Sequence, residues 1–384
     1  MSIIKDDNNF VSNTYARFPI AIVKGKGAIG YDEDGKEYID LGSGIAVNAF
    51  GYSDDEWVDA VTKQLSKVQH TSNLYYTEPC VKLAKMLCEK TGAKKVFFGN
   101  SGAEANECAL KIARKYAEDK GISDAKIVTL ENSFHGRTLA TLAATGQDVF
   151  HKSFLPLPEG FCHIKAGDTE AFKNLVETEK IAAIMMEIVQ GEGGVMPLSE
   201  EFVKEVSKIA KEKDILVIID EVQTGNGRCG ALYSYMNYGI SPDVVTTAKG
   251  LGGGLPIGCC MMFEKTENVL KAGDHGSTFG GNPVASAGAL SILSRIDDKL
   301  LAEVKEKSDM IFSAFTDCKG VKSISGMGLM IGIETEKDAG EIIAECMKKG
   351  VLVIKAKNKV RLLPPLNITK EELVKAIDVI KSCL

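Results

Sequence analysis

Residues 215–220 read ILVIID, an apolar run that ends in an aspartate. This pattern predicts a buried strand with Asp220 at its carboxyl end. Just before it, residues 200–213 read EEFVKEVSKIAKEK, and their apolar residues recur at the spacing of one helix face: Phe202, Val203, Val206, Ile209 and Ala210. A helix that leads at once into a buried strand is typical of a parallel sheet covered by helices.

The same alternation runs through the middle of the chain from about residue 95. Further short apolar strands are predicted at KVFF (95–98), KIVTL (126–130), IAAIMME (181–187) and VVTTA (244–248). Amphipathic stretches separate these strands. We therefore expect an α/β protein built on a mostly parallel sheet.

Both ends of the chain follow a different pattern. Residues 28–41, AIGYDEDGKEYIDL, predict a β-hairpin with a glycine in its turn. After about residue 280 we expect a helical run, a closing helix from Ile368, and strands at GLMIGIE (328–334), VLVI (351–354) and VRLL (360–363). The predicted division is an N-terminal hairpin segment (1–48) that is part of a small domain, a large domain (49–280) and a C-terminal small α+β domain (281–384).

The composition argues against several functions. The 384 residues include 46 Lys and Arg against 52 Asp and Glu, so the net charge of -6 disfavours nucleic-acid binding. No stretch approaches the roughly 18 apolar residues that cross a bilayer, and the first ten residues lack the apolar core of a signal peptide. The ten cysteines form no C-x-x-C pair, so no metal site is expected. These features predict a cytoplasmic protein with free thiols and neither a membrane nor a nucleic-acid partner.

A first candidate site follows the strand at 95–98. In Asn100-Ser-Gly-Ala-Glu104, Ser101 and Glu104 have the spacing of a capping box, which is common at ordinary helix starts. A helix that begins just past a strand also offers free N–H groups to an anion, and small residues allow close approach. The segment therefore suits either a plain helix start or a phosphate.

Two further candidates follow buried strands. Acids after a strand often lie in a solvated turn, but ligands of open α/β sheets bind at the carboxyl ends of strands, where Asp220 could meet a cationic nitrogen. Most lysines are surface residues, yet Lys249 interrupts the uncharged stretch VVTTAKGLGGGLPIGCCMM. A desolvated lysine can attack a carbonyl and form a Schiff base. The glycine run is not a dinucleotide fingerprint, because Leu255 stands where its last glycine should be.

The fourth candidate is Ser133-Phe-His-Gly-Arg137. An arginine can pair bidentately with a carboxylate, and Phe134 can stack on a planar ring, although Arg137 could also be an ordinary surface charge. His135 alone is more often a packed histidine than a base. A phosphate cradle, an acid for a ring nitrogen, a Schiff-base lysine and an aromatic stacker together suit pyridoxal phosphate.

With these residues the sequence resembles the fold-type I, class III aminotransferases, most closely their acetylornithine branch. The resemblance covers nearly the whole chain in order, through the motifs Gly35-Lys-Glu-Tyr-Ile-Asp40, Gly44-Ile-Ala-Val-Asn48, Asn100 to Asn106, Phe134-His-Gly-Arg-Thr138, Gln190-Gly-Glu-Gly-Gly194, Asp220-Glu-Val-Gln-Thr-Gly225, Ala248-Lys-Gly250 and Ser277-Thr-Phe-Gly-Gly-Asn-Pro283. It implies a large, mostly parallel seven-stranded sheet domain with helices on both faces, plus a smaller α+β domain.

The resemblance also implies a cofactor, pyridoxal 5'-phosphate. Lys249 is similar to the family's Schiff-base lysine, and Asp220 to the acid that keeps the ring nitrogen protonated. The other implied contacts are Gln223 at the ring hydroxyl, Val222 and Phe134 on the ring faces, and Ser101, Gly102 and Ala103 at the phosphate.

Substrate contacts and a partner are implied in the same way. Arg137 and Arg361 resemble the arginines that hold substrate carboxylates, and Glu192 resembles the glutamate that masks or releases Arg361. Ser277 and Thr278 resemble a segment that a second subunit contributes at the phosphate, with Ser277 as a substrate contact and Thr278 as a cofactor contact. A homodimer with shared active sites is therefore expected.

The expected reaction moves the δ-amino group of N2-acetylornithine to 2-oxoglutarate with ping-pong kinetics. Enzymes for free ornithine tend to carry a tyrosine where this chain has Ile45, which favours an α-acylated donor. Glu187-Ile-Val-Gln190 and Met327 depart from the family's usual residues. Ornithine, succinylornithine, 4-aminobutyrate and succinyl-diaminopimelate are alternative donors, and a non-catalytic protein of this fold is a further alternative.

Overall fold

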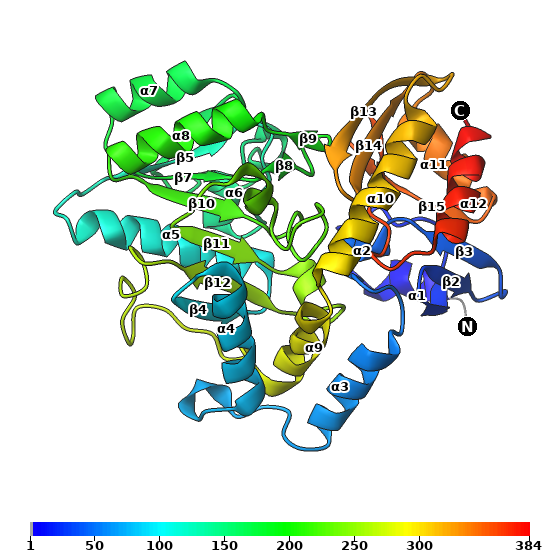
Figure 1. Ribbon diagram of the computed structural model, residues 1–384, viewed down its shortest axis with the longest axis horizontal. Helices are drawn as coiled ribbons and strands as arrows, with labels where there is room; N and C mark the ends of the chain where they lie inside the picture. Colours follow the sequence, from blue (N-terminus) through cyan, green and yellow to red (C-terminus); the bar gives the residue numbers. More distant parts are fainter. Residues whose placement is uncertain (1–2) are drawn as a thin grey trace.

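The computed structural model describes residues 3–384 and centres on a seven-stranded sheet in the order β4-β12-β11-β10-β7-β5-β6 (Figure 1). Its strands are β4 (Lys95–Gly99), β5 (Lys126–Leu130), β6 (Phe161–Ile164), β7 (Ile181–Met186), β10 (Leu216–Asp220), β11 (Val244–Thr247) and β12 (Gly258–Met262). β12 is antiparallel to both neighbours, and the other pairs are parallel. The expected mostly parallel, seven-stranded sheet is confirmed.

Helices cover both faces of this sheet because its strands are apolar on both sides. In β10, Val217 and Ile219 belong to one core cluster with α8 (Glu200–Glu212), whereas Leu216 and Ile218 belong to a second cluster with α5 (Gly102–Glu118). Figure 1 shows α7 (Thr169–Thr178) and α8 on one side of the sheet and α5 on the other. Three more helices lie at the sheet's edges and ends: α4 (Glu78–Thr91), α6 (Leu139–Ala144) and α9 (Pro283–Ser294).

The remaining strands form two four-stranded sheets and a short pair. The orders are β1-β2-β3-β15 and β13-β14-β17-β16, and β8 pairs with β9. Their bounds are β1 (Ile22–Lys26), β2 (Ile29–Asp32), β3 (Glu37–Asp40), β8 (Val189–Gln190), β9 (Met196–Pro197), β13 (Val321–Met327), β14 (Met330–Thr335), β15 (Val351–Leu352), β16 (Ile354–Ala356) and β17 (Lys359–Leu362). The predicted N-terminal hairpin is β2 with β3, and it joins the C-terminal part of the chain because β3 pairs in parallel with β15.

The prediction of a single strand at 351–354 is wrong, because these residues belong to two sheets. Residues 351–352 pair with β3, whereas residues 354–356 pair with β17 in the other sheet. The chain therefore passes from one sheet to the other at Val353. The segment boundaries at residues 48 and 280 stay a prediction.

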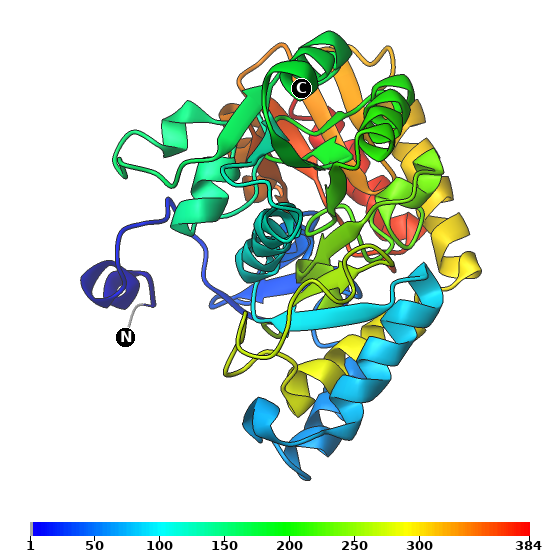
Figure 2. The same cartoon turned by 90° about the vertical axis from the view of Figure 1, so that its left-hand side faces the viewer.

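The other helical elements complete the chain: α1 (Ile3–Phe10), α2 (Ser43–Ala46), α3 (Asp55–Leu65), α10 (Asp298–Phe315), α11 (Ala339–Lys348), α12 (Lys370–Lys381) and the 3-10 turns η1 (Ser72–Leu74), η2 (Asp148–Phe150), η3 (Ser234–Tyr238) and η4 (Lys249–Leu251). Helix α1 buries none of its residues and stands clear of the main body in Figure 2. None of the helices formed by residues 3–384 combines the length and apolar character that crossing a bilayer requires.

Candidate active site

A cavity of about 590 Å³ opens where β7, β10 and β11 end and α5 begins. This is the edge at which an open α/β sheet binds ligands. Most of the predicted cofactor residues line it: Ser101, Gly102, Ala103, Phe134, Asp220, Val222, Gln223 and Lys249. Arg137 lines it as well. The fold thus brings together residues that lie more than 140 positions apart in the chain.

The start of α5 forms one wall of the cavity. Ser101 is the N-cap, and its Oγ accepts from the Glu104 N–H at 3.1 Å. The expected capping box is only half formed, because Glu104 Oε2 accepts from the N–H of Asn100 rather than that of Ser101. A Cβ on Gly102 would lie 2.6 Å from Val222 Cγ1, so this glycine lets the helix start close against Val222. The free first-turn N–H groups suit a phosphate.

Asp220 ends β10 and is 3% exposed. Its Oδ2 accepts two bonds of 2.8 Å, from Asn106 Nδ2 and from His135 Nδ1, while its Oδ1 accepts from the Val222 N–H at 3.0 Å. Asn106 is itself fixed by Thr246, whose hydroxyl donates to Asn106 Oδ1 at 2.6 Å. Three donors thus converge on the Asp220 side chain and fix it at the cavity wall, where a cationic ring nitrogen could bind it.

His135 is packed, as its type suggested, but it also supports Asp220. Burial acts to lower the pKa of the imidazole, and the hydrogen bond and charge of Asp220 outweigh it, so the pKa of His135 is raised. Its Nε2 is buried without a partner among residues 3–384. Asp220 thus favours the protonated imidazole, which donates a charge-assisted hydrogen bond to it.

Lys249 lies two residues past the end of β11, and its amine forms no hydrogen bond or ion pair with any residue of the described chain. Burial lowers the pKa of the Lys249 ammonium, and the positive charge of Arg361 lowers this pKa further. The negative charges of Glu192, Asp220 and Glu187 oppose the shift in part. A lysine amine with a lowered pKa is more often neutral and therefore nucleophilic.

Arg361 lies on β17 and is closed off by Glu192. Arg361 Nη1 is 2.6 Å from Glu192 Oε1 and 3.2 Å from Gln223 Oε1. Burial acts to raise the pKa of Glu192, but the charge of Arg361 dominates and lowers it, so the pair is ionised. Glu192 thus occupies the part of the Arg361 guanidinium that a carboxylate would bind.

Arg137, by contrast, is exposed and has no ion pair among the described residues. Its guanidinium lies 4.1 Å from the ring centroid of Phe150 and 5.4 Å from that of Phe134. Stacking on aromatic faces leaves the planar edge of a guanidinium free to bind a carboxylate.

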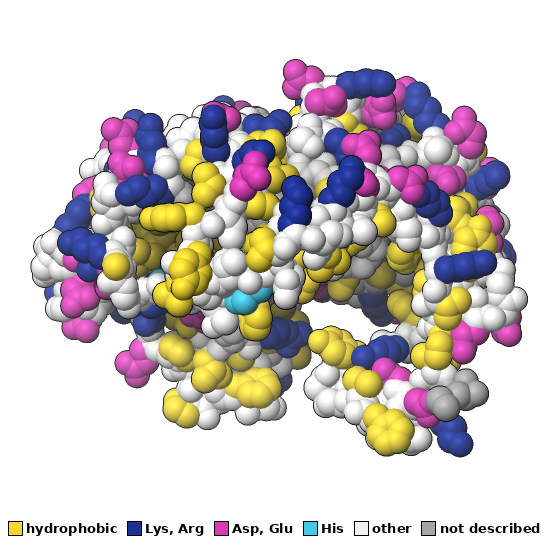
Figure 3. Space-filling view, turned by 90° about the horizontal axis from the view of Figure 1, so that it is seen from below, with side chains coloured by type: hydrophobic (Ala, Val, Ile, Leu, Met, Phe, Trp, Pro, Cys, Tyr) yellow, Lys and Arg dark blue, Asp and Glu magenta, His cyan; other side chains and the backbone are white. Residues whose placement is uncertain are grey.

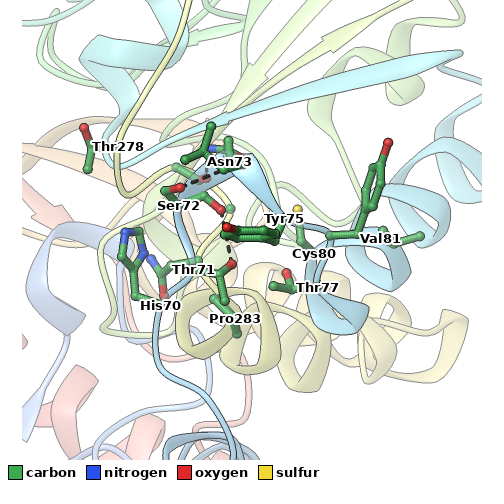
Figure 4. A pocket seen from close by; sticks show the side chains of 15 residues that line it. His70, Thr71, Ser72, Asn73, Tyr75, Thr77, Cys80, Val81, Thr278 and Pro283 are labelled. Atoms are coloured by element: carbon green, nitrogen blue, oxygen red, sulfur yellow. Dashed lines mark hydrogen bonds between the residues drawn. The ribbon is translucent and has the colours of Figure 1, made fainter.

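Ser277 and Thr278 do not line the cavity within one chain. Ser277 Oγ accepts from Asn100 Nδ2 at 3.1 Å, beside the start of α5. Thr278 lines a different cavity together with residues 70–77 and 280–283 (Figure 4). Their expected role at a second subunit's site stays a prediction.

Four residues at the cavity were missed from the sequence as site residues: Tyr15, Asn106, His135 and Glu187. Asn106 sits on an inner helix face and Glu187 merely follows an apolar strand, so neither has a local signal of its own. Tyr15 lies in a segment without periodic pattern, and only the fold brings it to the wall. Asn106 could have been found only by placing α5 against β10.

The chain matches the class-III aminotransferase family over residues 10–384. It therefore belongs to the class-III aminotransferases, whose cofactor is pyridoxal 5'-phosphate. The cavity fits this group, since it provides a half-buried lysine, an aspartate held by three hydrogen bonds, and a helix start with small residues.

Among curated relatives, the acetylornithine aminotransferase of Haemophilus ducreyi is 48% identical over 381 residues, covering 98% of this chain and 97% of that protein. That of Aquifex aeolicus is 44% identical, covering 98% and 100%. Among solved structures, the ornithine aminotransferase of Toxoplasma gondii has a TM-score of 0.95 at 31% identity, covering 99% of this chain and 93% of that one. The N-acetylornithine aminotransferase of Stenotrophomonas maltophilia has a TM-score of 0.86 at 32% identity, covering 99% and 98%.

Proposed function

We propose that this aminotransferase moves the δ-amino group of N2-acetylornithine to 2-oxoglutarate, giving N-acetylglutamate 5-semialdehyde and glutamate, a step of arginine biosynthesis. The observation that carries the proposal is a pair of arginines in opposite environments. Arg137 lines the cavity of Lys249 and is open, whereas Arg361, whose charge acts on Lys249, is closed by Glu192. The acetylornithine aminotransferases that cover nearly the whole chain support the choice of donor.

In this proposal the cavity residues hold the cofactor. Asp220 keeps its ring nitrogen protonated, Gln223 contacts its hydroxyl, and the start of α5 at Ser101, Gly102 and Ala103 binds its phosphate. Val222 and Phe134 contact the two ring faces. When bound, the cofactor supplies an electron sink beside the reacting carbon.

Lys249 does the proton transfer. With the donor bound, Lys249 Nζ would accept the proton that leaves the donor's δ-carbon. The same amine returns a proton later in the half-reaction. Its lowered pKa suits this work, because a general base must be neutral before it accepts.

The two substrates place their carboxylates differently. Acetylornithine reacts at its δ-carbon, so its carboxylate lies at the far end, where Arg137 is open. Glutamate reacts beside its α-carboxylate, which would bind Arg361 after Glu192 has turned away. While Glu192 neutralises Arg361, an uncharged methylene chain can pass it. One pocket can thus serve both half-reactions.

Ile45 supports an acylated donor over free ornithine. It is 44% exposed and stands in α2, close in sequence to Val47 of the cavity wall. A branched aliphatic side chain offers no hydrogen bond to a free α-ammonium group.

We further propose that the enzyme is a cytoplasmic homodimer in which Ser277 and Thr278 complete the partner's site, with no membrane or nucleic-acid partner. Four large apolar side chains near Thr278 in the chain or in its cavity are exposed by 60–100%: Leu74, Tyr75, Tyr76 and Phe279. Figure 3 shows hydrophobic side chains gathered on one face, and such patches favour association. All ten cysteines are free, which suits a reducing compartment.

The test is a panel of amino donors assayed with 2-oxoglutarate. We expect N2-acetylornithine to give the highest kcat/KM, with activity on succinylornithine or succinyl-diaminopimelate next. Free ornithine and 4-aminobutyrate should be at least about tenfold lower. An α-ammonium group left without a partner near Ile45 costs about 1–3 kcal/mol, and the shorter chain of 4-aminobutyrate does not carry its carboxylate as far as that of acetylornithine. Faster turnover of free ornithine would contradict the choice of donor, and no turnover of any donor would favour a non-catalytic role.

A further inference from the structure

Lys249 leaves its strand through a conformation that residues with a side chain seldom adopt. β11 ends at Thr247, Ala248 is extended, and Lys249 has a φ of +44°. A non-glycine residue at positive φ costs free energy and persists only where its surroundings hold it. The side chains that hold this turn therefore determine where the Lys249 amine lies.

The side chain of Asn226 holds this turn by hydrogen bonds. Its Nδ2 donates to Thr247 Oγ1 at 2.9 Å and to the carbonyl oxygen of Ala248 at 3.2 Å, and the residue is 3% exposed. The same Ala248 oxygen accepts from the Leu251 N–H at 2.9 Å, which closes η4. A Cβ built on Gly250 would come 3.4 Å from Asn226 Cβ. The asparagine thus bonds the two residues before Lys249 and lies against the one after it.

Asn226 also ends the loop that begins at Asp220. It has a φ of +57°, which asparagine tolerates better than most residues. The loop is fixed near its other end by Glu221, whose buried carboxylate accepts from the Ser234 hydroxyl at 2.7 Å and from the Tyr235 N–H at 2.9 Å. A rigid loop therefore carries the acid at its start and the amide that bonds the Lys249 turn at its end.

We propose that Asn226 is a positioning residue for Lys249, through which the loop of Asp220 sets the place of the amine relative to the acid. This inference rests on the proposed role of Lys249 and is independent of which donor is preferred. Because the ionisation of the amine depends on its distance from Asp220, Glu192 and Arg361, a shift of the turn changes both the rate and the pH at which the lysine-bound cofactor titrates.

Two variants of the holoenzyme test it. Asn226→Asp keeps the size but replaces the donor by an acceptor that faces a carbonyl oxygen, and Asn226→Gly keeps the freedom to adopt positive φ but removes the side chain. We expect both to bind pyridoxal phosphate, with the pH midpoint of the visible absorbance moved by about half a unit or more. Turnover should fall at least about tenfold, because a small misplacement of a reacting group can reduce the rate by that much. The KM values should stay within about twofold.

The matched control is Asn237→Asp, since Asn237 also donates from Nδ2 to a backbone carbonyl, that of Cys229 at 3.1 Å, and makes no contact with Lys249. It should keep the wild-type spectrum and turnover. Asn226 variants with a lower thermal midpoint but an unchanged pH midpoint and kcat would overturn the inference, because they would show a purely structural role. Borohydride reduction of the wild type followed by peptide mapping tests the proposed function separately. Reduced cofactor attached to another lysine would show that Lys249 is not the Schiff-base residue, whatever the Asn226 variants do.

Discussion

At the scale of single residues, Glu187 is a buried carboxyl with little to compensate its charge. It directly follows β7, is 5% exposed, and accepts one hydrogen bond in the described chain, from the Phe134 N–H at 3.0 Å. Burial raises the pKa of Glu187 from 4.5 to about 7, and Asp220 adds to the shift, while His135 and Lys249 oppose it. Glu187 therefore keeps a proton over a range in which an ordinary glutamate is ionised.

This predicts how stability changes with pH. A carboxyl whose pKa is higher in the folded than in the unfolded state stabilises the fold at low pH, and that stabilisation is lost as the pH rises toward 7. Glu187→Gln removes the titration. The free energy of unfolding of the cofactor-free variant should therefore rise relative to that of the wild type between pH 5 and pH 8, as measured by urea unfolding at each pH.

The control is the same substitution at Glu341, an exposed residue of α11. The free energy of unfolding of this variant, relative to that of the wild type, should change little between pH 5 and pH 8. If the Glu187→Gln difference were as flat as that of Glu341→Gln, Glu187 would not titrate in the folded protein near neutral pH.

Whether a site residue could be predicted depended on its neighbours in the sequence. Lys249 and Asp220 stand out because each is the charged residue at the end of an apolar run. Asn106 and His135 do not, because they acquire their role only through contact with Asp220, which lies 114 and 85 positions away. Polar support of a catalytic group comes from tertiary packing, and no local pattern encodes it.

At the scale of elements, the start of α5 lies directly over β12 because Gly258 has no side chain. A Cβ on Gly258 would lie 2.0 Å from the carbonyl oxygen of Ser101. Since this neighbour is backbone, the helix start would have to move away from the sheet. The position of the turn that we propose to bind the phosphate thus depends on a residue in a strand.

Gly258→Ala should therefore weaken cofactor binding and destabilise the fold. Overpacking of this kind typically costs about 1–3 kcal/mol, and the affinity for pyridoxal phosphate should fall about tenfold or more. Equilibrium binding followed by absorbance, together with urea unfolding, measures both effects.

Gly30→Ala in β2 is the matched control, because a Cβ there meets side-chain atoms only at 3.4 Å and beyond. We expect wild-type affinity from it. Wild-type affinity in Gly258→Ala as well would mean that the helix start does not bind the phosphate where we place it.

The elements themselves were largely predictable where hydrophobic pattern alone decides them. The strands predicted at 95–98, 126–130, 215–220 and 244–248 all form. Strands β6 and β12 were not predicted, because FCHI and GCCMM contain few of the β-branched residues that are typical of strands. The division of 351–356 between two sheets could not be predicted either, since it depends on pairing with β3 and β17.

At the scale of the whole molecule, the site needs distant parts of the chain to meet. Arg361 comes from β17, Glu192 follows β8, and Arg137 follows the end of β5. Arg137 lines the same cavity as Lys249, while the charges of Arg361 and Glu192 act on the Lys249 amine. The resemblance to a family predicted these arginines, whereas periodicity and composition could not, because their roles depend on how the sheets are placed. The central claim is therefore that these residues act differently on the two substrates.

The most direct measurement is a pair of single-turnover experiments on the holoenzyme. N2-acetylornithine alone should remove the visible absorbance of the lysine-bound cofactor, and 2-oxoglutarate should restore it. In Arg361→Ala we expect the second step to slow by about 10- to 100-fold, as loss of a charge-assisted contact predicts, with little change in the first. Arg137→Ala should slow the first step instead, and Lys249→Ala should show neither step. Equal losses in both half-reactions of Arg361→Ala, or no absorbance change with N2-acetylornithine, would contradict the account.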